Sequence, residues 1–162
     1  MGRLTARRVA TPHRHVIARR TGSLYPDEWV IVGGHYDSRQ QNINDPSQSP
    51  GAEDNASGCA GVVEAARVFS QFPPQRTMIF VCFAGEEQGL YGGNAYAQAL
   101  QTSGDLAKVD LAVIMDMIGY SGDADLDVRV CGAQPGVAHT IRGHIHEVTP
   151  RTLVCLKPQS AE

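Results

Sequence analysis

The chain has 162 residues, of which 42% are hydrophobic and 19% are charged, and its formal net charge is −3 at pH 7. This length fits a single domain of ~100–200 residues with a sizeable buried core. The small negative charge gives no electrostatic reason to expect nucleic acid as a partner. No apolar run approaches the ~20 residues of a membrane span, and no hydrophobic signal segment opens the chain. No membrane contact is therefore expected, and the localisation is left open.

Strand and helix patterns alternate along the chain. Short apolar runs bounded by glycine, proline or aspartate predict strands, and apolar residues at helical spacing predict helices. In chain order, we expect strands at 15–18 and 29–32, a helix at about 56–72, a strand at 77–83, a helix at 90–100, strands at 109–115 and 128–131, a helix at 135–148 and a strand at 152–156.

This alternation predicts an α/β fold in one domain, residues 1–162. Helices are expected on both faces of a mixed, mostly parallel sheet, which gives a three-layer α/β/α sandwich. A turn-rich stretch at 21–28 joins the first two expected strands. These two strands are therefore expected to pair as an antiparallel N-terminal hairpin at the edge of the sheet.

Acidic side chains and one histidine follow three of these strands or precede the first helix. In chain order they are His35, Asp37, Asp54, Glu86, Glu87 and Asp116. Ligands bind at the carboxyl ends of strands in open α/β sheets. Taken singly, Asp54 is explained as a helix cap and Asp116 as a turn residue. Taken together, the six residues favour a bound cation, because burying unpaired charges is unfavourable.

The types of these side chains indicate which cation is expected. Imidazole nitrogen and carboxylate oxygen suit zinc, with cobalt or manganese as alternatives. The four cysteines are widely spaced, which argues against a thiolate site. Adjacent side chains in an extended chain point different ways, so one of Glu86 and Glu87 can hold a metal while the other handles protons.

Four motifs in the order GGHYDS, PGAEDNASG, AGEEQGLYGG and MDMIGY resemble those of the co-catalytic di-zinc aminopeptidases, the family of bacterial leucyl aminopeptidase, aminopeptidase Y and glutamate carboxypeptidase. The resemblance covers roughly residues 15–156. It implies the zinc-exopeptidase fold, two zinc ions in a complete site, and hydrolysis of the first bond of a peptide with a free N-terminus. It also favours a secreted or periplasmic location.

The resemblance implies a role for most of the residues above. His35 and Asp116 would bind one zinc ion. Glu87 would bind the other ion, and Asp54 would bridge the two. Asp37 would orient His35, as metal-bound histidines usually require.

Catalysis and one feature of the backbone are implied as well. Glu86 would be the general base, taking a proton from a metal-bridged water and returning it to the departing amine. The peptide bond between Asp54 and Asn55 would be cis.

One part of the family pattern is not found. The family's fifth ligand is a histidine in a Ser-Asp-His segment, and this chain ends about where that segment should begin. His139, His144 and His146 lie in an expected helix without this motif. The chain is therefore expected to be a partial domain that holds two, one or no zinc ions and has little peptidase activity by itself. An uncovered C-terminal surface would favour self-association.

Two other functions stay open at this point. A glutaminyl cyclase-like acyltransferase would share the family fold. A non-catalytic binding module, as in transferrin receptor, would explain the missing histidine, whereas the intact pair Glu86 and Glu87 favours an enzyme.

Overall fold

The computed structural model describes residues 14–40, 51–119, 128–131 and 152–158. Strands and helices alternate within these ranges, with one irregular turn (η1), in which Asp54 and Asn55 have non-helical backbone angles, and one 3₁₀ turn (η2). In chain order the elements are β1 (Val16–Arg20), β2 (Tyr25–His35), η1 (Ala52–Ser57), α1 (Gly58–Gln71), β3 (Arg76–Phe83), α2 (Tyr91–Ser103), η2 (Asp105–Lys108), β4 (Val109–Met115), β5 (Val128–Cys131) and β6 (Thr152–Pro158). The helix expected at 135–148 lies outside the described residues.

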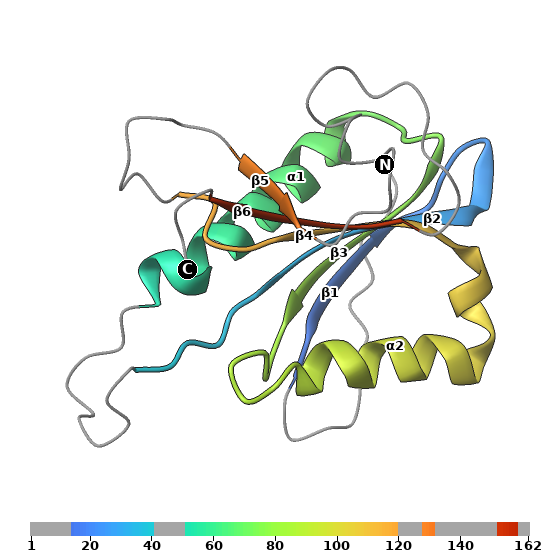
Figure 1. Cartoon of the computed structure of the whole chain (residues 1–162). Coiled ribbons are helices and arrows are strands. Elements are labelled where there is room, and N and C mark those ends of the chain that lie inside the picture. The colour runs from blue at the N-terminus through green and yellow to red at the C-terminus, as the bar shows by residue number, and fades with distance from the viewer. Residues whose placement is uncertain (1–13, 41–50, 120–127, 132–151, 159–162) are drawn as a thin grey trace.

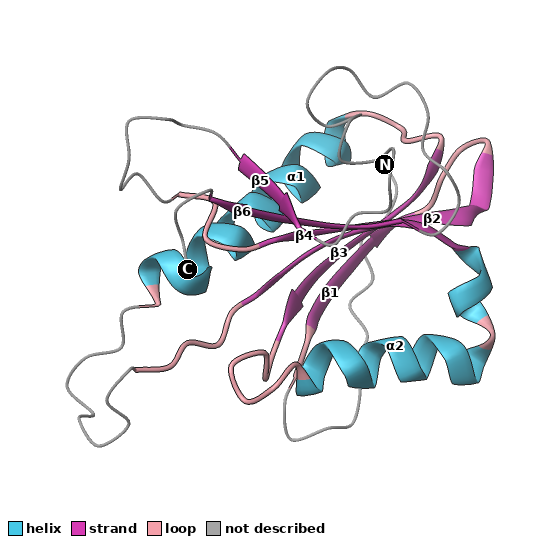
Figure 2. Cartoon of the chain, in the orientation of Figure 1, coloured by secondary structure: helices cyan, strands magenta, loops and turns pink. Residues whose placement is uncertain are grey.

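The described strands form one six-stranded sheet in the order β1-β3-β2-β4-β6-β5. Its four inner strands, β3, β2, β4 and β6, run parallel. The two edge strands, β1 and β5, are antiparallel to their neighbours. Helix α1 covers one face of the sheet and α2 covers the other (Figures 1 and 2). The predicted three-layer α/β/α sandwich with a mixed, mostly parallel sheet is therefore confirmed.

The predicted N-terminal hairpin is wrong in its pairing. Strand β1 pairs with β3, with Val16 opposite Cys82, and β3 separates β1 from β2. The connection passes around the start of β3, where the amide of Ser23 donates to the carbonyl of Pro74 and Gly22 donates to Thr77 Oγ1. Residues 77–82 of β3 are all buried, and a position between two neighbouring strands favours such burial over a position at the edge.

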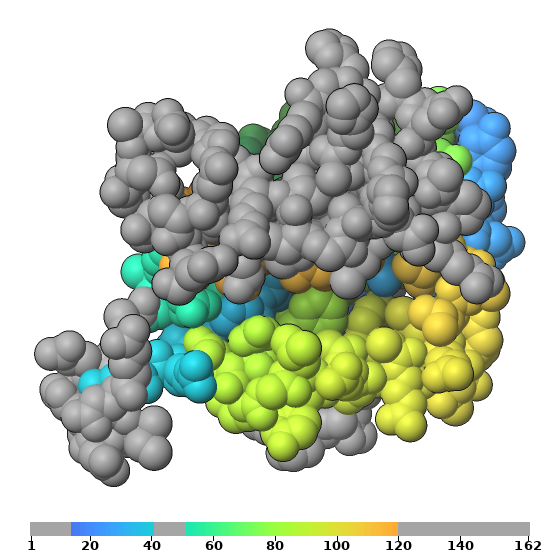
Figure 3. Space-filling model, viewed as in Figure 1, coloured from blue at the N-terminus to red at the C-terminus, as the bar shows by residue number. Residues whose placement is uncertain are grey.

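The core lies on both faces of β3. Met78, Phe80 and Cys82 face α1, and the alternate residues Ile79 and Val81 face α2. All five are buried. Full burial of a large apolar side chain contributes about 1.5–3 kcal/mol, so this strand anchors both helical layers. Figure 3 shows α2 as the outer layer on its side of the sheet. None of the helices in the described ranges combines the length and apolar character that crossing a membrane requires.

The start of α2 packs directly on the end of β3. A Cβ at Gly92 would overlap the carbonyl oxygen of Ala84 and would lie 2.6 Å from Cε1 of His15. His15 is itself buried, and its Nδ1 accepts the amide hydrogen of Ala84 at 3.2 Å. The backbone that leads from β3 to Glu86 is therefore held from two sides.

We predict that Gly92→Ala lowers the free energy of unfolding by about 1–3 kcal/mol, because the added methyl must push α2 away from a backbone carbonyl. Gly93→Ala is the matched control, since nothing lies within 4 Å of a Cβ at Gly93. That change should raise the free energy of unfolding by up to ~1 kcal/mol through helix propensity. Urea unfolding of both variants measures the difference, and equal stabilities would contradict this packing.

Candidate metal centre

The polar side chains predicted at the strand ends meet at one edge of the sheet. His35 ends β2, Asp116 follows β4, and Glu86 and Glu87 follow β3. These three strands are neighbours and run parallel, so their carboxyl ends lie side by side. Asp54 reaches the same edge from η1, just before α1.

His35 lies at the centre of the group. Its Nε2 is 3.1 Å from Asp54 Oδ1, 3.6 Å from Asp116 Oδ1 and 3.9 Å from Glu86 Oε2. Its Nδ1 lies 3.0 Å from the main-chain carbonyl oxygen of Asp37, which can accept a hydrogen from it. A hydrogen on Nδ1 leaves Nε2 of the neutral ring as the atom that can bind a metal.

The charge environment of His35 is strongly acidic. Burial lowers the pKa of the imidazole, but the hydrogen bond with Asp116, the charge of Glu86 and the backbone contact to Asp37 outweigh burial and raise the pKa to about 9. A protonated imidazole is thus one way in which the cluster is neutralised without a metal. A divalent cation is the other, because it supplies more positive charge at the same point.

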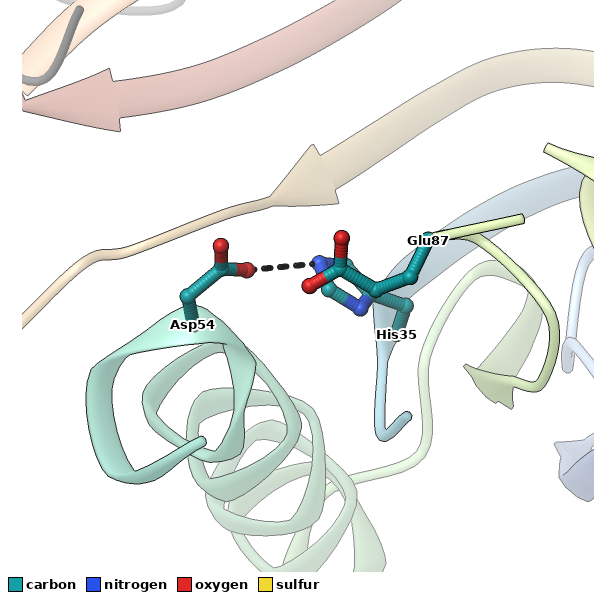
Figure 4. A group of neighbouring side chains, drawn as sticks. All are labelled: His35, Asp54 and Glu87. Carbon is teal, nitrogen blue, oxygen red and sulfur yellow. Dashed lines mark ion pairs between the residues drawn. The ribbon is translucent and has the colours of Figure 1, made fainter. Parts of the chain in front are cut away.

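Glu87 completes a set of possible ligands with His35 and Asp54. One ligand atom from each of the three residues lies within 4.8 Å of the other two. Figure 4 shows the three side chains pointing toward one another. Zinc bonds to nitrogen and oxygen are about 2.0–2.2 Å long, so ligand atoms this close together suit one zinc ion or two neighbouring ions. The donor set of imidazole and carboxylates therefore fits zinc.

The carboxyl group of Glu87 is held in an acidic, buried position. Burial has the largest effect and raises the pKa of Glu87. The negative charges of Asp54 and Glu86 raise this pKa further, and the positive charges of His35 and Arg39 lower it. The side chain of Glu87 is 9% exposed, and Arg39 Nε lies 3.1 Å from its Oε2. Arg39 was not singled out from the sequence, because an arginine in a polar loop carries no sign of which carboxylate it will meet.

Asp37 contacts both His35 and the turn after β3 that carries Glu86 and Glu87. Its two carboxylate oxygens each accept a backbone amide hydrogen at 3.1 Å, Oδ1 from Glu86 and Oδ2 from Glu87. Its contact with His35 Nδ1 is made mainly by the main-chain carbonyl, while the carboxylate lies 3.7 Å away. Both contacts position groups at the centre, so Asp37 links the end of β2 to the segment after β3.

Asn55 is an organising residue for which the sequence analysis gave no role beyond the expected cis bond. It is fully buried, and its Oδ1 accepts amide hydrogens from Gly58 at 2.9 Å and Met117 at 3.1 Å. Its Nδ2 donates to the carbonyl of Met115 at 2.9 Å. The peptide bond between Asp54 and Asn55 is cis, as the family resemblance implied. Asn55 thereby ties the entrance of α1 to the end of β4 and sets Asp54 opposite Asp116.

A cavity of about 500 Å³ opens beside the cluster, between α2 and the sheet. His35, Glu86 and Asp116 line one part of it, and the rest of its wall is mostly apolar, including Leu100 and Val109. His35 and Asp116, two of the candidate metal ligands, therefore face a space that a substrate-sized group can enter. The candidates His139, His144 and His146 lie outside the described residues.

The sequence profile of peptidase family M28 matches residues 15–155. This match covers most of the chain. The chain belongs to peptidase family M28. The predicted membership of the di-zinc aminopeptidase family is thus confirmed, and the residues that carry the four motifs are those that meet at the candidate metal centre.

Among curated relatives, a protein named probable zinc metalloprotease from Pyrenophora teres f. teres is 44% identical over 113 residues, which cover 68% of this M28 chain and 23% of the relative. The chain spans about a quarter of the length of the curated relatives it matches.

Solved structures show the same fold. A zinc aminopeptidase from Bacillus subtilis has a TM-score of 0.67 and 26% identity, with 89% of this chain and 34% of that chain covered. A glutaminyl cyclase from an Acidobacteriales bacterium has a TM-score of 0.65 and 23% identity, with 96% and 57% covered. At 23% sequence identity, the similarity to the cyclase shows a shared fold and nothing about function.

For this M28 chain we predict that Asp37→Asn weakens the binding of a divalent metal by about 10–100-fold, the usual effect of removing a group that positions metal ligands. An amide has an NH2 donor in place of one of the two carboxylate oxygens, so the backbone amide of either Glu86 or Glu87 would lose its acceptor. Asp27→Asn is the matched control, since Asp27 has a side chain that is 80% exposed beside Lys108. Titration calorimetry of the metal-free variants measures the effect, and equal affinities for both variants would contradict this role.

Proposed function

We propose that the chain carries the metal centre of a zinc-dependent aminopeptidase that acts on peptides with a free N-terminus. The observation that carries this proposal is the convergence of His35, Asp54 and Glu87 on one point, with Glu86 and Asp116 beside them. Membership of peptidase family M28 supports a peptidase. The relatives named zinc metalloprotease and zinc aminopeptidase support zinc as the metal.

In this proposal, each residue has one task. His35 and Asp116 would hold one zinc ion, Glu87 would hold a second, and Asp54 would be a ligand of both. When bound, the metal pair would acidify water and polarise the scissile carbonyl.

Glu86 is suited to proton transfer because it lies at the edge of the ligand set rather than within it. Its Oε2 is 3.9 Å from His35 Nε2, and about a third of its side chain is exposed, at 34%. It also lines the cavity through which substrate would approach. Glu86 accepts the proton of the attacking water and returns it to the departing amine.

Two alternatives stay separable by experiment. A glutaminyl cyclase-like acyltransferase would cyclise peptides with an N-terminal glutamine and leave amino-acid anilides uncleaved. A non-catalytic module would do neither. Assaying both substrates with the same preparation distinguishes the three functions, and light scattering tests the accompanying proposal that the chain self-associates.

We predict that the chain binds one or two zinc ions and that Asp54→Asn removes most of this binding, because the proposal gives Asp54 a bond to both ions. Asp110→Asn is the matched control, since Asp110 pairs with Arg76 at the start of β4 and has no part in the cluster. Elemental analysis after dialysis gives the zinc content of each. A chain without zinc, or an Asp54→Asn variant that keeps all of it, would contradict the proposed metal centre.

We predict that Glu86→Gln keeps the zinc content and lowers the hydrolysis of amino-acid anilides by at least ~10²-fold, the lower end of the usual contribution of a general base. The amide retains the shape of the side chain but cannot accept the proton of water. Zinc content and turnover should be measured on the same preparation. Loss of zinc together with turnover would show that Glu86 is a ligand and that its role was exchanged with that of Glu87.

A further inference from the structure

Arg39 approaches the candidate metal centre from solvent. Its side chain is 68% exposed, whereas that of its partner Glu87 is 9% exposed, and Arg39 Nε lies 3.1 Å from Glu87 Oε2. The mechanism proposed above gives Arg39 no task. A guanidinium in contact with a proposed metal ligand is nevertheless a positive charge close to the place that a cation would take.

The segment that carries Arg39 is anchored close to Glu87. Asp37, two residues before Arg39, accepts the backbone amides of Glu86 and Glu87 with its carboxylate. The contact between Arg39 and Glu87 therefore follows from the anchored segment as well as from the length of the arginine side chain.

The contact leaves room for a metal ion. A carboxylate has two oxygens and about four acceptor positions, so one oxygen can pair with arginine while the other binds a cation. If the guanidinium stays, it draws negative charge away from the ligand and repels the ion. If it leaves, its ion pair with Glu87 must first be broken. Both routes weaken the binding of the cation.

We infer that Arg39 is a positioning residue that holds Glu87 in the metal-free protein and lowers the affinity of the centre for zinc. The inference rests on the proposed metal centre and adds to it a group that sets how tightly the ion is held. Among the proposed ligands, it is Glu87 with which Arg39 forms an ion pair.

The test compares the zinc affinity of the 162-residue chain and three variants of it by competition with a chromophoric chelator. We expect Arg39→Gln to bind zinc about three- to tenfold more tightly, the size expected for one partly exposed charge a few ångströms away. Arg39→Lys keeps the charge and should stay within about twofold of the unchanged chain. Arg76→Gln is the matched control, because Arg76 pairs with Glu28 and Asp110 at the other end of the strands.

Ionic strength provides a second readout. The difference between Arg39→Gln and the unchanged chain should shrink at 1 M salt, where the screening length falls to about 3 Å. A purely steric effect would not respond in this way. Equal or weaker zinc binding by Arg39→Gln, or an equal gain in affinity in Arg76→Gln, would overturn the role of Arg39 and leave the proposed metal centre standing. Absence of zinc binding in every chain would overturn both the inference and the proposed metal centre.

Discussion

Four carboxylates surround one buried imidazole, and much of the described structure serves to keep them there. Oxygen atoms of Asp37, Asp54, Glu86 and Asp116 lie between 3.1 and 3.9 Å from a ring nitrogen of His35. Charges of one sign at this density are unfavourable without a compensating cation. The elements that carry them must therefore be fixed by interactions elsewhere.

The parallel sheet supplies the first part of that support. Strands β3, β2 and β4 end at one edge, and α1 approaches the same edge closely because Gly34 has no side chain. A Cβ at Gly34 would lie 3.0 Å from the carbonyl carbon of Gly58 and 3.2 Å from the carbonyl oxygen of Met115. Asn55 then fastens the entrance of α1 to the end of β4. Packing and hydrogen bonds together hold Asp54 where its charge alone would not place it.

The sequence predicted the elements and the ligand candidates because both leave local signals. The apolar run of β3 and the glycine-flanked pair Glu86 and Glu87 are visible in a few consecutive residues. The pairing of β1 with β3 was missed, because periodicity shows that a strand exists and is silent about its neighbour. The insertion of β3 between β1 and β2 is decided by which strand gains most from burial on both faces, and that comparison involves the whole sheet.

Contacts between distant segments were missed for a similar reason. The two carboxylate contacts of Asp37 join residues about 50 positions apart, and Asn55 bonds to residues about 60 positions away. Asp37 was expected only beside His35, and Asn55 only as a partner in a cis peptide bond with Asp54, since both relations are local. Arg39 gave no signal at all, because its partner Glu87 is identified only when the turn after β3 folds back onto the end of β2.

In the proposed metal centre, a proton and a metal ion compete for the imidazole of His35. The folded-state pKa of His35, about 9, lies above its ordinary value of 6.5. The stabilisation from its charged contacts is therefore fully present below pH 6.5 and is lost as the pH rises through about 9. A metal needs the neutral ring, so binding below pH 9 must release this proton, and the affinity of the metal must rise with pH over that range. The acidic cluster that attracts a cation thus also holds the proton that the cation has to displace, and the two effects set the affinity together.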